Sequence, residues 1–199
     1  AVVTKKKAIN DWTPISTIVT DADELSLTKG SIYAHSQTLA SLIEAIKQGH
    51  KKIAVVGTPC NSEAISKMQS RKGGLLSETP DLEIYNVGLF CMESFIPSTL
   101  KTIIQNKNIN FNSIAKMGFE GGSFVLRDAT YEKMASLSIK SLHEAIESSC
   151  RVCPDFACEH ADISIGRTGA DEGYNSVLVR SEKMLKIINE MKEKGILVI

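Results

Sequence analysis

The stretch Lys51-Lys52-Ile53-Ala54-Val55-Val56-Gly57 decides the fold, because a polar entry, an apolar run rich in β-branched residues and a closing glycine follow one another. Such a run is typical of a strand buried within a parallel sheet. Residues 61–69 follow with helical spacing, so the two segments form a βα unit. Ahead of them, the apolar residues of 36–48 also fall at helical spacing, and Gly49 ends that helix. Strands that alternate with helices predict an α/β layered domain.

Further elements extend this alternation in both directions. We expect strands at 1–4, 83–90, 161–166 and 176–179 and after Gly195, and helices at 95–106, 138–148 and 182–194. Residues 12–24 are expected to form a loop that leads into a short helical turn. A hairpin is expected for 114–119 and 123–126, and it indicates a mixed rather than a wholly parallel sheet. The sequence therefore predicts one domain, residues 1–199, with a mixed β-sheet flanked by helices.

The composition limits the classes of partner. Lys plus Arg equals Asp plus Glu, 23 each, so no overall charge favours nucleic acid or an anionic membrane. The apolar runs are far shorter than the ~20 residues of a membrane-spanning helix. Five unevenly spaced cysteines argue against a secreted disulfide framework and for a reducing compartment. We therefore expect a cytoplasmic protein with no nucleic-acid partner and no membrane span.

Cysteines follow two of the predicted strands and recur as a pair further on. Gly57-Thr58-Pro59-Cys60 leaves the first strand through a tight turn and puts Cys60 in the first turn of a helix, where unpaired backbone amides stabilise a thiolate. Cys91 follows the next strand, and ligands gather at the carboxyl ends of strands in open α/β sheets. Cys150 and Cys153 form a Cys-x-x-Cys pair.

These cysteines admit several chemistries. A Cys-x-x-Cys pair alone is also typical of a structural zinc half-site or a redox dithiol, and Cys60 can be read as an ordinary buried thiol. If Cys60, Cys91, Cys150 and Cys153 meet at one place, they provide the four thiolates that a cubane iron–sulfur cluster or a structural zinc requires. Cys158 lies where the chain already enters the next strand, so we rank it fifth.

Several motifs occur in one order along nearly the whole chain. They are Gly57-Thr58-Pro59-Cys60, Phe90-Cys91, Cys150-x-x-Cys153-x-Asp155-Phe156, the Ala-Asp-Ile-Ser-Ile-Gly of 161–166 and the Gly-Tyr-Asn-Ser-Val-Leu-Val-Arg of 173–180. Together they resemble the beta subunit of coenzyme F420-reducing hydrogenase and its relatives. The resemblance implies a 4Fe-4S cluster held by Cys60, Cys91, Cys150 and Cys153, and a bound FAD. Cys158 has no counterpart in the family's pattern.

The implied activity is that of an F420-dependent oxidoreductase. Electrons pass from the cluster through FAD to coenzyme F420, or the reverse, because a flavin can collect single electrons for a hydride transfer. Lys29-Gly30-Ser31-Ile32-Tyr33 is similar to the family's Ser-x-Tyr segment near the flavin, which implies flavin contacts for Ser31 and Tyr33. Further candidates for close approach to the flavin are Gly57, Thr58, Ser164 and Gly166, each of which also suits a turn or a strand end without a ligand. No histidine or other residue is assigned a catalytic role.

The resemblance also implies partners. Other hydrogenase or reductase subunits with iron–sulfur clusters would exchange electrons with this chain, and coenzyme F420 would be its substrate. The phosphate and carboxylates of that coenzyme need a basic pocket, for which the candidates are Lys51, Lys52, Arg127, Arg151, Arg167 and Arg180. Two alternatives stay open: an F420- or ferredoxin-linked electron-input module of another reductase complex, and a non-enzymatic scaffold whose four cysteines bind zinc.

One feature departs from the family. Family members generally carry an amino-terminal segment with a glycine-containing stretch and a helix before the strand that corresponds to residues 1–4. The sequence begins with Ala1-Val2-Val3-Thr4, without an initiator Met. We therefore expect an N-terminally truncated or partly recorded subunit, whose flavin site lacks that segment.

Overall fold

The computed structural model describes residues 1–8, 11–70, 76, 79 and 81–198. They fall into two compact units. Unit 1 consists of Ala1–Val3, Thr38–Cys91 and Pro154–Ile199, and unit 2 of Thr4–Gln37 and Met92–Cys153.

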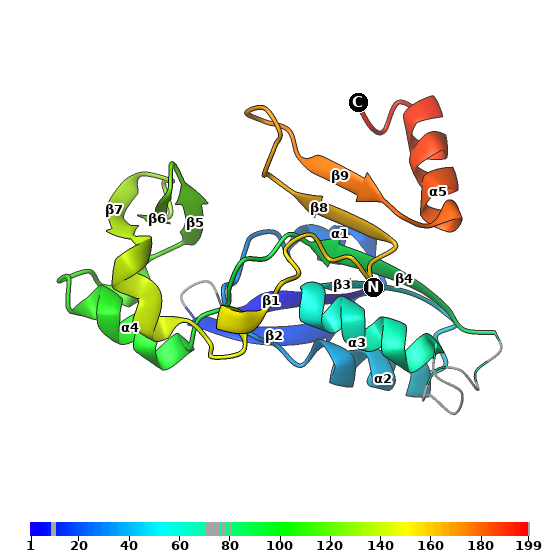
Figure 1. Cartoon of the computed structure of the whole chain (residues 1–199), viewed down its shortest axis with the longest axis horizontal. Coiled ribbons are helices and arrows are strands. Elements are labelled where there is room, and N and C mark those ends of the chain that lie inside the picture. The colour runs from blue at the N-terminus through cyan, green and yellow to red at the C-terminus, as the bar shows by residue number, and fades with distance from the viewer. Residues whose placement is uncertain (9–10, 71–75, 77–78, 80, 199) are drawn as a thin grey trace. The chain divides into compact units, whose positions relative to one another are not determined.

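Unit 1 is built on parallel strands (Figure 1). The strands β3 (Lys52–Gly57), β4 (Glu83–Leu89) and β8 (Ile163–Gly166) run parallel, whereas β9 (Ser176–Val179) pairs with β8 in the antiparallel direction. The complete strand order is β2-β1-β3-β4-β8-β9, in which β1 (Val2–Ala8) runs parallel to β3 and continues from unit 1 into unit 2. The sheet is therefore mixed, as the sequence predicted.

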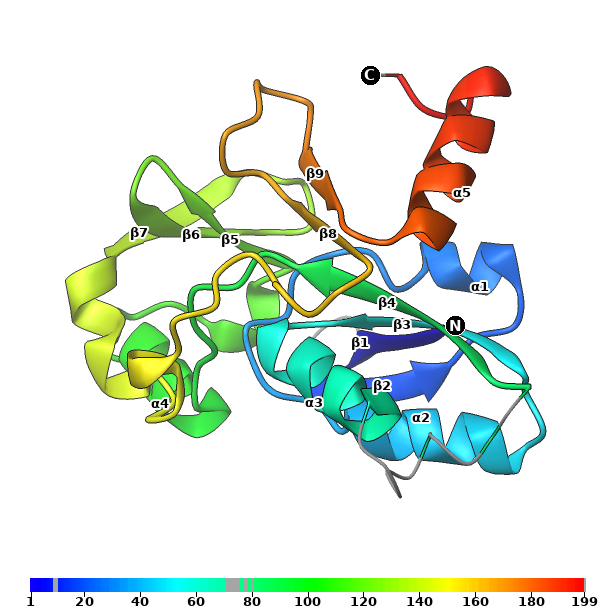
Figure 2. The same cartoon turned by 45° about the vertical axis from the view of Figure 1, so that its right-hand side comes forward.

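Helices pack on this sheet through buried residues on one face. In α2 (Thr38–Lys47) the buried residues include Leu42 and Ala45, and in α3 (Pro59–Ser70) they include Ser62 and Ile65. These two helices lie side by side along β3 and β4, and α5 (Glu182–Glu193) lies on the other side of the sheet (Figure 2). Ser181 caps α5 by accepting a hydrogen bond from the amide of Met184. The predicted layered α/β arrangement is thus confirmed.

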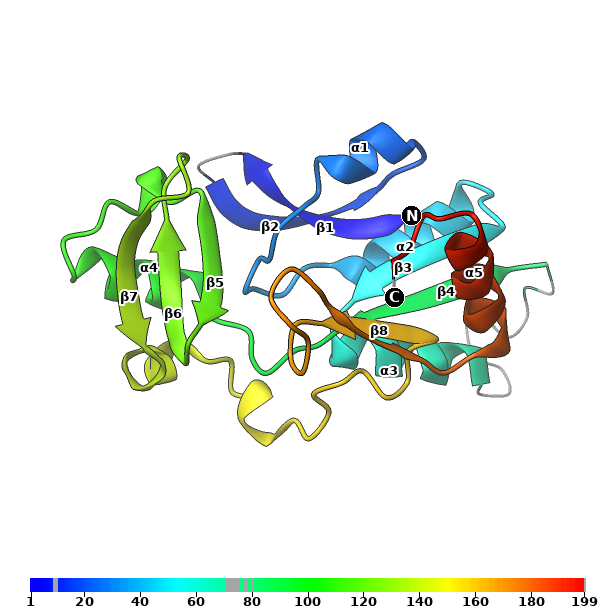
Figure 3. The same cartoon turned by 90° about the horizontal axis from the view of Figure 1, so that it is seen from above.

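Unit 2 combines a small antiparallel sheet with short helices. Strands β5 (Lys116–Glu120), β6 (Ser123–Arg127) and β7 (Lys133–Ser138) pair in that order (Figure 3). Unit 2 also contains β2 (Asp11–Ile18) and the helices α1 (Ala22–Ser26), α4 (Pro97–Gln105), η1 (Phe111–Ser113), η2 (Ile139–Ala145) and η3 (Cys150–Val152).

An aromatic and aliphatic core holds unit 2 together. Phe95 and Phe124 are fully buried with ring centroids 5.4 Å apart, and Leu126, Leu137 and Leu142 pack in the same cluster. Burying one such side chain contributes roughly 1.5–3 kcal/mol. Unit 2 therefore has a hydrophobic core of its own.

The structure differs from four of the expectations drawn from the sequence. Residues 12–18 belong to strand β2 rather than to a loop, and Pro14 is tolerated because β2 is the outermost strand in the order. The expected hairpin exists as β5 and β6, but in its own sheet, so β9 makes the main sheet mixed. Residues 139–145 are wound as a 3₁₀ helix rather than an α-helix. Residues 195–198 form no strand, and Ile199 lies outside the described residues.

None of the helices in the described part of the chain has the length and apolar character that a membrane crossing needs.

Candidate functional site

In unit 1, the carboxyl ends of neighbouring strands bring the predicted residues into line. The parallel register pairs Gly57 of β3 with Gly88 of β4, and Gly88 with Ser164 of β8. Cys60 and Cys91 are each the third residue after one of the paired glycines. Because parallel strands end at the same edge, both cysteines leave the sheet at corresponding points, as ligand-binding residues of open α/β sheets do.

Cys60 lies in the first turn of α3. Pro59 is the first residue of this helix, as expected for a proline at a helix start, and Cys60 is exposed. The Thr58 Oγ1 atom lies 3.2 Å from the Cys60 sulfur and accepts a hydrogen bond from the Asn61 side chain at 3.0 Å. A Cβ at Gly57 would lie 2.9 Å from the Cβ of Asn61. Gly57 and Thr58 therefore shape the turn that presents Cys60.

Cys91 is held where β4 ends. Its amide donates to the carbonyl oxygen of Phe156 at 3.0 Å, and the amide of Phe90 donates to that of Ile165 at 2.9 Å. The Phe90 ring lies over Gly166, where a Cβ would come within 2.2 Å of a ring atom, and 5.2 Å from the Phe156 ring. Gly166 was predicted as a flavin contact, and a larger residue at this position would collide with the Phe90 ring. Cys91 itself is half-buried.

Cys158 differs from the other cysteines. It is fully buried, its φ is +55°, and its thiol donates to the carbonyl oxygen of Leu89 at 3.0 Å. Burial raises the pKa of the Cys158 thiol to about 12, and the nearby Asp155 carboxylate adds to this effect. A Cβ at Gly88 would lie 2.4 Å from the Cβ of Cys158. Cys158 therefore serves as a protonated packing group that fixes its loop to the end of β4.

Ser164 is also engaged within unit 1. It is fully buried and accepts a hydrogen bond from Arg180 at 2.5 Å, while a second nitrogen of Arg180 donates to the carbonyl of Ala157 at 3.0 Å. Beside it, Asp162 accepts from the amide of Asn86 at 2.8 Å and forms an ion pair with Lys183 at 2.8 Å. These contacts fasten the loop before β8 to β4 and to the start of α5.

In unit 2, Cys150 has polar neighbours that the sequence did not reveal. The amide of Ser94 lies 3.4 Å from the Cys150 sulfur and donates to it, and the Nε2 atom of His35 lies 4.0 Å from the same sulfur. Cys150 begins η3 and packs against the unit 2 core, whereas Cys153 follows η3 and is exposed. His35 stands 115 residues before Cys150, so no local motif could link the two.

The predicted flavin segment also lies in unit 2. The carbonyl of Tyr33 accepts a hydrogen bond from the amide of Phe95 at 2.7 Å. The Tyr33 ring meets Phe119 and Phe124 nearly edge-on, at centroid distances of 5.3 and 5.2 Å. Ser31 is exposed. Tyr33 is thus anchored in the aromatic core, close in sequence to His35 and so to Cys150.

The candidate basic residues have mostly structural partners. Arg127 pairs with Glu120 at 2.7 Å, Arg151 donates to the carbonyl of His143 at 2.9 Å, and Lys52 lies 3.6 Å from Glu83. Lys51 and Arg167 are exposed. Arg167 follows β8 at the same edge as Cys60 and Cys91, so it remains the candidate of this group best placed for an anionic ligand.

The four predicted ligands thus form two pairs: Cys60 and Cys91 in unit 1, and Cys150 and Cys153 in unit 2. In the described part of the chain, no three or more His, Cys, Asp or Glu side chains form a group that could hold a metal ion. Neither pair provides a complete metal site by itself.

Residues 50–199 match a family model that describes the C terminus of the coenzyme F420 hydrogenase/dehydrogenase beta subunit. The chain belongs to this family. The match includes the strand ends that carry Cys60 and Cys91 and the stretch from Cys150 to Gly166. The resemblance inferred from the motifs is therefore confirmed.

Individual relatives show how far the similarity extends. An uncharacterized protein of Methanocaldococcus jannaschii is 33% identical over 195 residues, covering 94% of this chain and 69% of the relative. A coenzyme F420-dependent sulfite reductase of the same organism is 32% identical, over 92% of this chain and 30% of the relative. The coenzyme F420 hydrogenase subunit beta of Methanothermobacter thermautotrophicus is 29% identical, over 93% and 66%.

A solved structure agrees with the fold. A chain of the F420-reducing NiFe hydrogenase complex from Methanosarcina barkeri superposes with a TM-score of 0.87 at 25% identity, over 98% of this chain and 66% of that one. This chain therefore spans less than two thirds of the length of several of these relatives.

Proposed function

We propose that this chain is part of an F420-dependent oxidoreductase and passes electrons between an iron–sulfur cluster, FAD and coenzyme F420. The observation that carries the proposal is the family match over residues 50–199, together with the two cysteines that leave β3 and β4 at corresponding points. Relatives named for a hydrogenase and for a sulfite reductase have coenzyme F420 in common. The proposal therefore specifies coenzyme F420 as the substrate and leaves the electron donor open.

Cys60, Cys91, Cys150 and Cys153 are the proposed ligands of a 4Fe-4S cluster, and the two units would act together as one FAD/iron–sulfur domain. The donor chemistry fits this cluster, because all four thiols are exposed or half-buried while Cys158 is fully buried. The amide that donates to the Cys150 sulfur fits as well, since such hydrogen bonds stabilise thiolates and set cluster potentials. When bound, the cluster supplies single-electron transfer and the flavin supplies two-electron hydride transfer.

The protein's own contribution would be positioning and water exclusion. The start of α3 directs backbone amides toward Cys60 and favours its thiolate. The rings of Phe90 and Phe156 pack together beside Cys91, whose amide donates to the carbonyl of Phe156, and His35 is placed to donate to or accept from the Cys150 sulfur. Hydride transfer between two flavin-like rings would need orientation more than a strong acid, so no general acid is proposed.

We propose different roles in FAD binding for the six predicted flavin residues. Ser31 and Thr58 keep hydroxyls at or near the surface and would contact FAD directly. Three residues at the strand ends would act through their backbone: Gly57, Gly166 and Ser164. A Cβ at either glycine would meet a neighbouring side chain, and the Ser164 hydroxyl already accepts a hydrogen bond from Arg180. Tyr33 would position the Ser31 segment from the aromatic core.

The proposed partners are subunits of a hydrogenase or reductase that carry further iron–sulfur clusters. The test is anaerobic purification of the full-length protein with these partners, followed by iron and sulfide analysis and an assay of coenzyme F420 reduction by its absorbance. We expect reduction that depends on the reductant fed to the partner subunits. A pure iron–sulfur- and flavin-loaded complex that leaves coenzyme F420 oxidised would contradict the proposal.

A further inference from the structure

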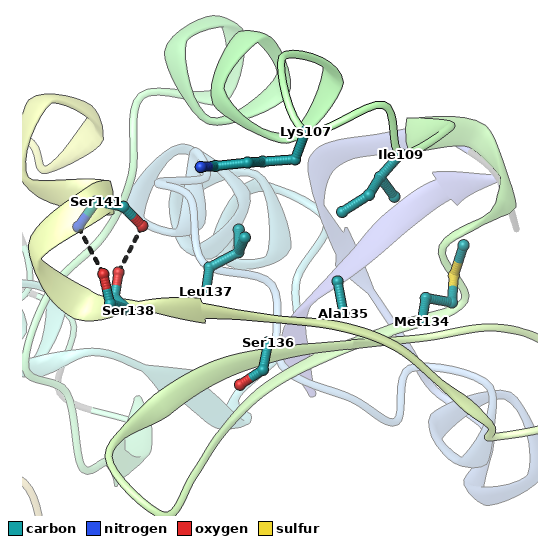
Figure 4. A pocket seen from close by; sticks show the side chains of 8 residues that line it. All are labelled: Lys107, Ile109, Met134, Ala135, Ser136, Leu137, Ser138 and Ser141. Atoms are coloured by element: carbon teal, nitrogen blue, oxygen red, sulfur yellow. Dashed lines mark hydrogen bonds between the residues drawn. The ribbon is translucent and has the colours of Figure 1, made fainter.

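A groove of about 350 Å³ lies along the outer edge of β7 in unit 2 (Figure 4). Five consecutive residues of 134–138 line it, and Lys107 and Ile109 form the facing wall. Neighbouring residues of a strand point to opposite faces. A hollow lined by consecutive residues therefore follows the edge of the strand rather than one of its faces.

The backbone of this edge is open. β7 is the last strand in the order β5-β6-β7 and pairs with β6 through registers such as Ala135 with Leu126 and Leu137 with Phe124. In the part of the chain that the structure describes, no backbone hydrogen bond joins residues 133–137 to any segment other than β6. At the end of the strand, Ser141 closes on Ser138 with two hydrogen bonds. An open edge of this kind is a template for pairing with another strand.

The charged residue that lines the groove is a lysine, Lys107, and Glu132 and Glu144 lie just outside the lysine-containing segment 133–143. Segments 97–119 and 133–143 contain no Asp or Glu. They contain Lys101, Lys107, Lys116, Lys133 and Lys140. Lys107 extends over Leu137 toward Ser141 (Figure 4), and neither Lys107 nor Lys133 has an ion pair with a described carboxylate. Like charges oppose the pairing of two copies of this edge and favour an acidic segment instead.

We infer that the β7 edge groove binds an extended, acidic segment of a partner polypeptide, which adds as a fourth strand. Backbone hydrogen bonds to β7 provide affinity in this mode, and side-chain sites provide specificity. Ile109, Met134 and Leu137 line the groove and offer apolar contacts for alternate side chains, and Lys107 lies in the same lining for an acidic one. Five residues of β7 span ~17 Å, enough for a short strand. The inference does not depend on the proposed redox function.

The test uses the full chain and short capped peptides in a fluorescence anisotropy titration. The probe alternates glutamate and valine. One control peptide has the same sequence with every backbone nitrogen methylated, which removes the backbone donors of both edges but keeps the charge. Another control replaces glutamate by lysine. The protein variants are Lys107→Glu with Lys133→Glu, and Lys186→Glu as a matched charge reversal on α5 of unit 1.

We expect the glutamate–valine peptide to bind and to slow amide hydrogen exchange of residues 133–138. The N-methylated peptide should bind about tenfold more weakly or worse, and so should the unmodified peptide to the variant with Lys107→Glu and Lys133→Glu. Lys186→Glu should change the affinity less than about twofold. Equal binding of the N-methylated peptide would show attraction by charge alone and overturn strand addition. Equal binding of the lysine peptide, no binding at all, or a dimer of the chain joined through β7 would also refute the inference.

Discussion

The packing of Gly88 against Cys158 gives the most direct prediction about this fold. In Gly88→Ala, the new Cβ would lie 2.4 Å from the Cβ and 2.8 Å from the sulfur of Cys158, and 2.9 Å from the Cβ of Ala161. Favourable contacts between carbon atoms need about 3.5–4.0 Å. The loop of residues 154–161 must therefore move away from the end of β4.

The magnitude follows from two losses. Overpacking of a tight interior costs about 1–3 kcal/mol. Displacing the loop also breaks the hydrogen bond from Cys158 to Leu89, which contributes about 0.5–1.5 kcal/mol. We expect Gly88→Ala to lower the free energy of unfolding by about 2–4 kcal/mol, and the melting temperature by about 4–16 °C for a chain of this size.

A second substitution tests whether the loss of stability comes from the clash with Cys158 or from any added side chain in a strand. Cys158→Gly removes the two clashing atoms of Cys158, leaving only the Cβ of Ala161, at a residue whose φ of +55° suits glycine. The double variant should therefore be more stable than the sum of the single effects predicts, by about 1–3 kcal/mol. The control is Gly118→Ala on β5, where a Cβ would meet nothing within 4 Å. Thermal unfolding followed by circular dichroism compares these four variants with the wild type. Equal melting of Gly88→Ala and Gly118→Ala, or no recovery in the double variant, would refute the reasoning.

Three further predictions concern the cysteines and the strand ends. Cys150→Ser should lose iron after anaerobic reconstitution while Cys158→Ser keeps it, and equal iron in both would contradict the ligand assignment. Because the pKa of Cys158 is raised to about 12 in the folded chain from an ordinary 9.0, its contribution to stability is complete below pH 9 and is lost as the pH rises from 9 to 12. The stability of Cys158→Ala should therefore lack this decrease between pH 9 and 12, and iodoacetamide should modify Cys60 before Cys158 in the native chain. The same pH dependence in both proteins, or the reverse order of labelling, would contradict the prediction. Gly166→Ala should displace the Phe90 ring, lower the melting temperature by several degrees and change near-ultraviolet circular dichroism, and a wild-type spectrum would argue against the packing described.

Much of unit 1 could be predicted from the sequence, because its signals are local. The apolar run before Gly57 and the Pro59 helix start determine the β3–α3 unit, and Gly88 before Cys91 repeats the same logic. Unit 2 was less predictable. Strand β7 has two serines and a lysine among its six residues, and its pattern indicates a strand only once β6 is beside it.

The candidate site also has parts that local sequence predicts and parts that only the fold reveals. The cysteines at strand ends follow from sequence and parallel pairing, whereas the contact between His35 and Cys150 depends on how distant segments of unit 2 fold together. Gly88 and Gly166 have a visible reason to be glycine only when Cys158 and Phe90 are in place. Such three-dimensional constraints leave no pattern in a single sequence.

The central claim is that Cys60, Cys91, Cys150 and Cys153 hold one iron–sulfur cluster. Its most direct test is the metal and sulfide content of the full-length protein after anaerobic isolation. The account predicts a brown protein with about four iron and four sulfide per chain, reduced in each of the four single Cys→Ser variants. A colourless protein with about one zinc and no sulfide per chain would contradict it.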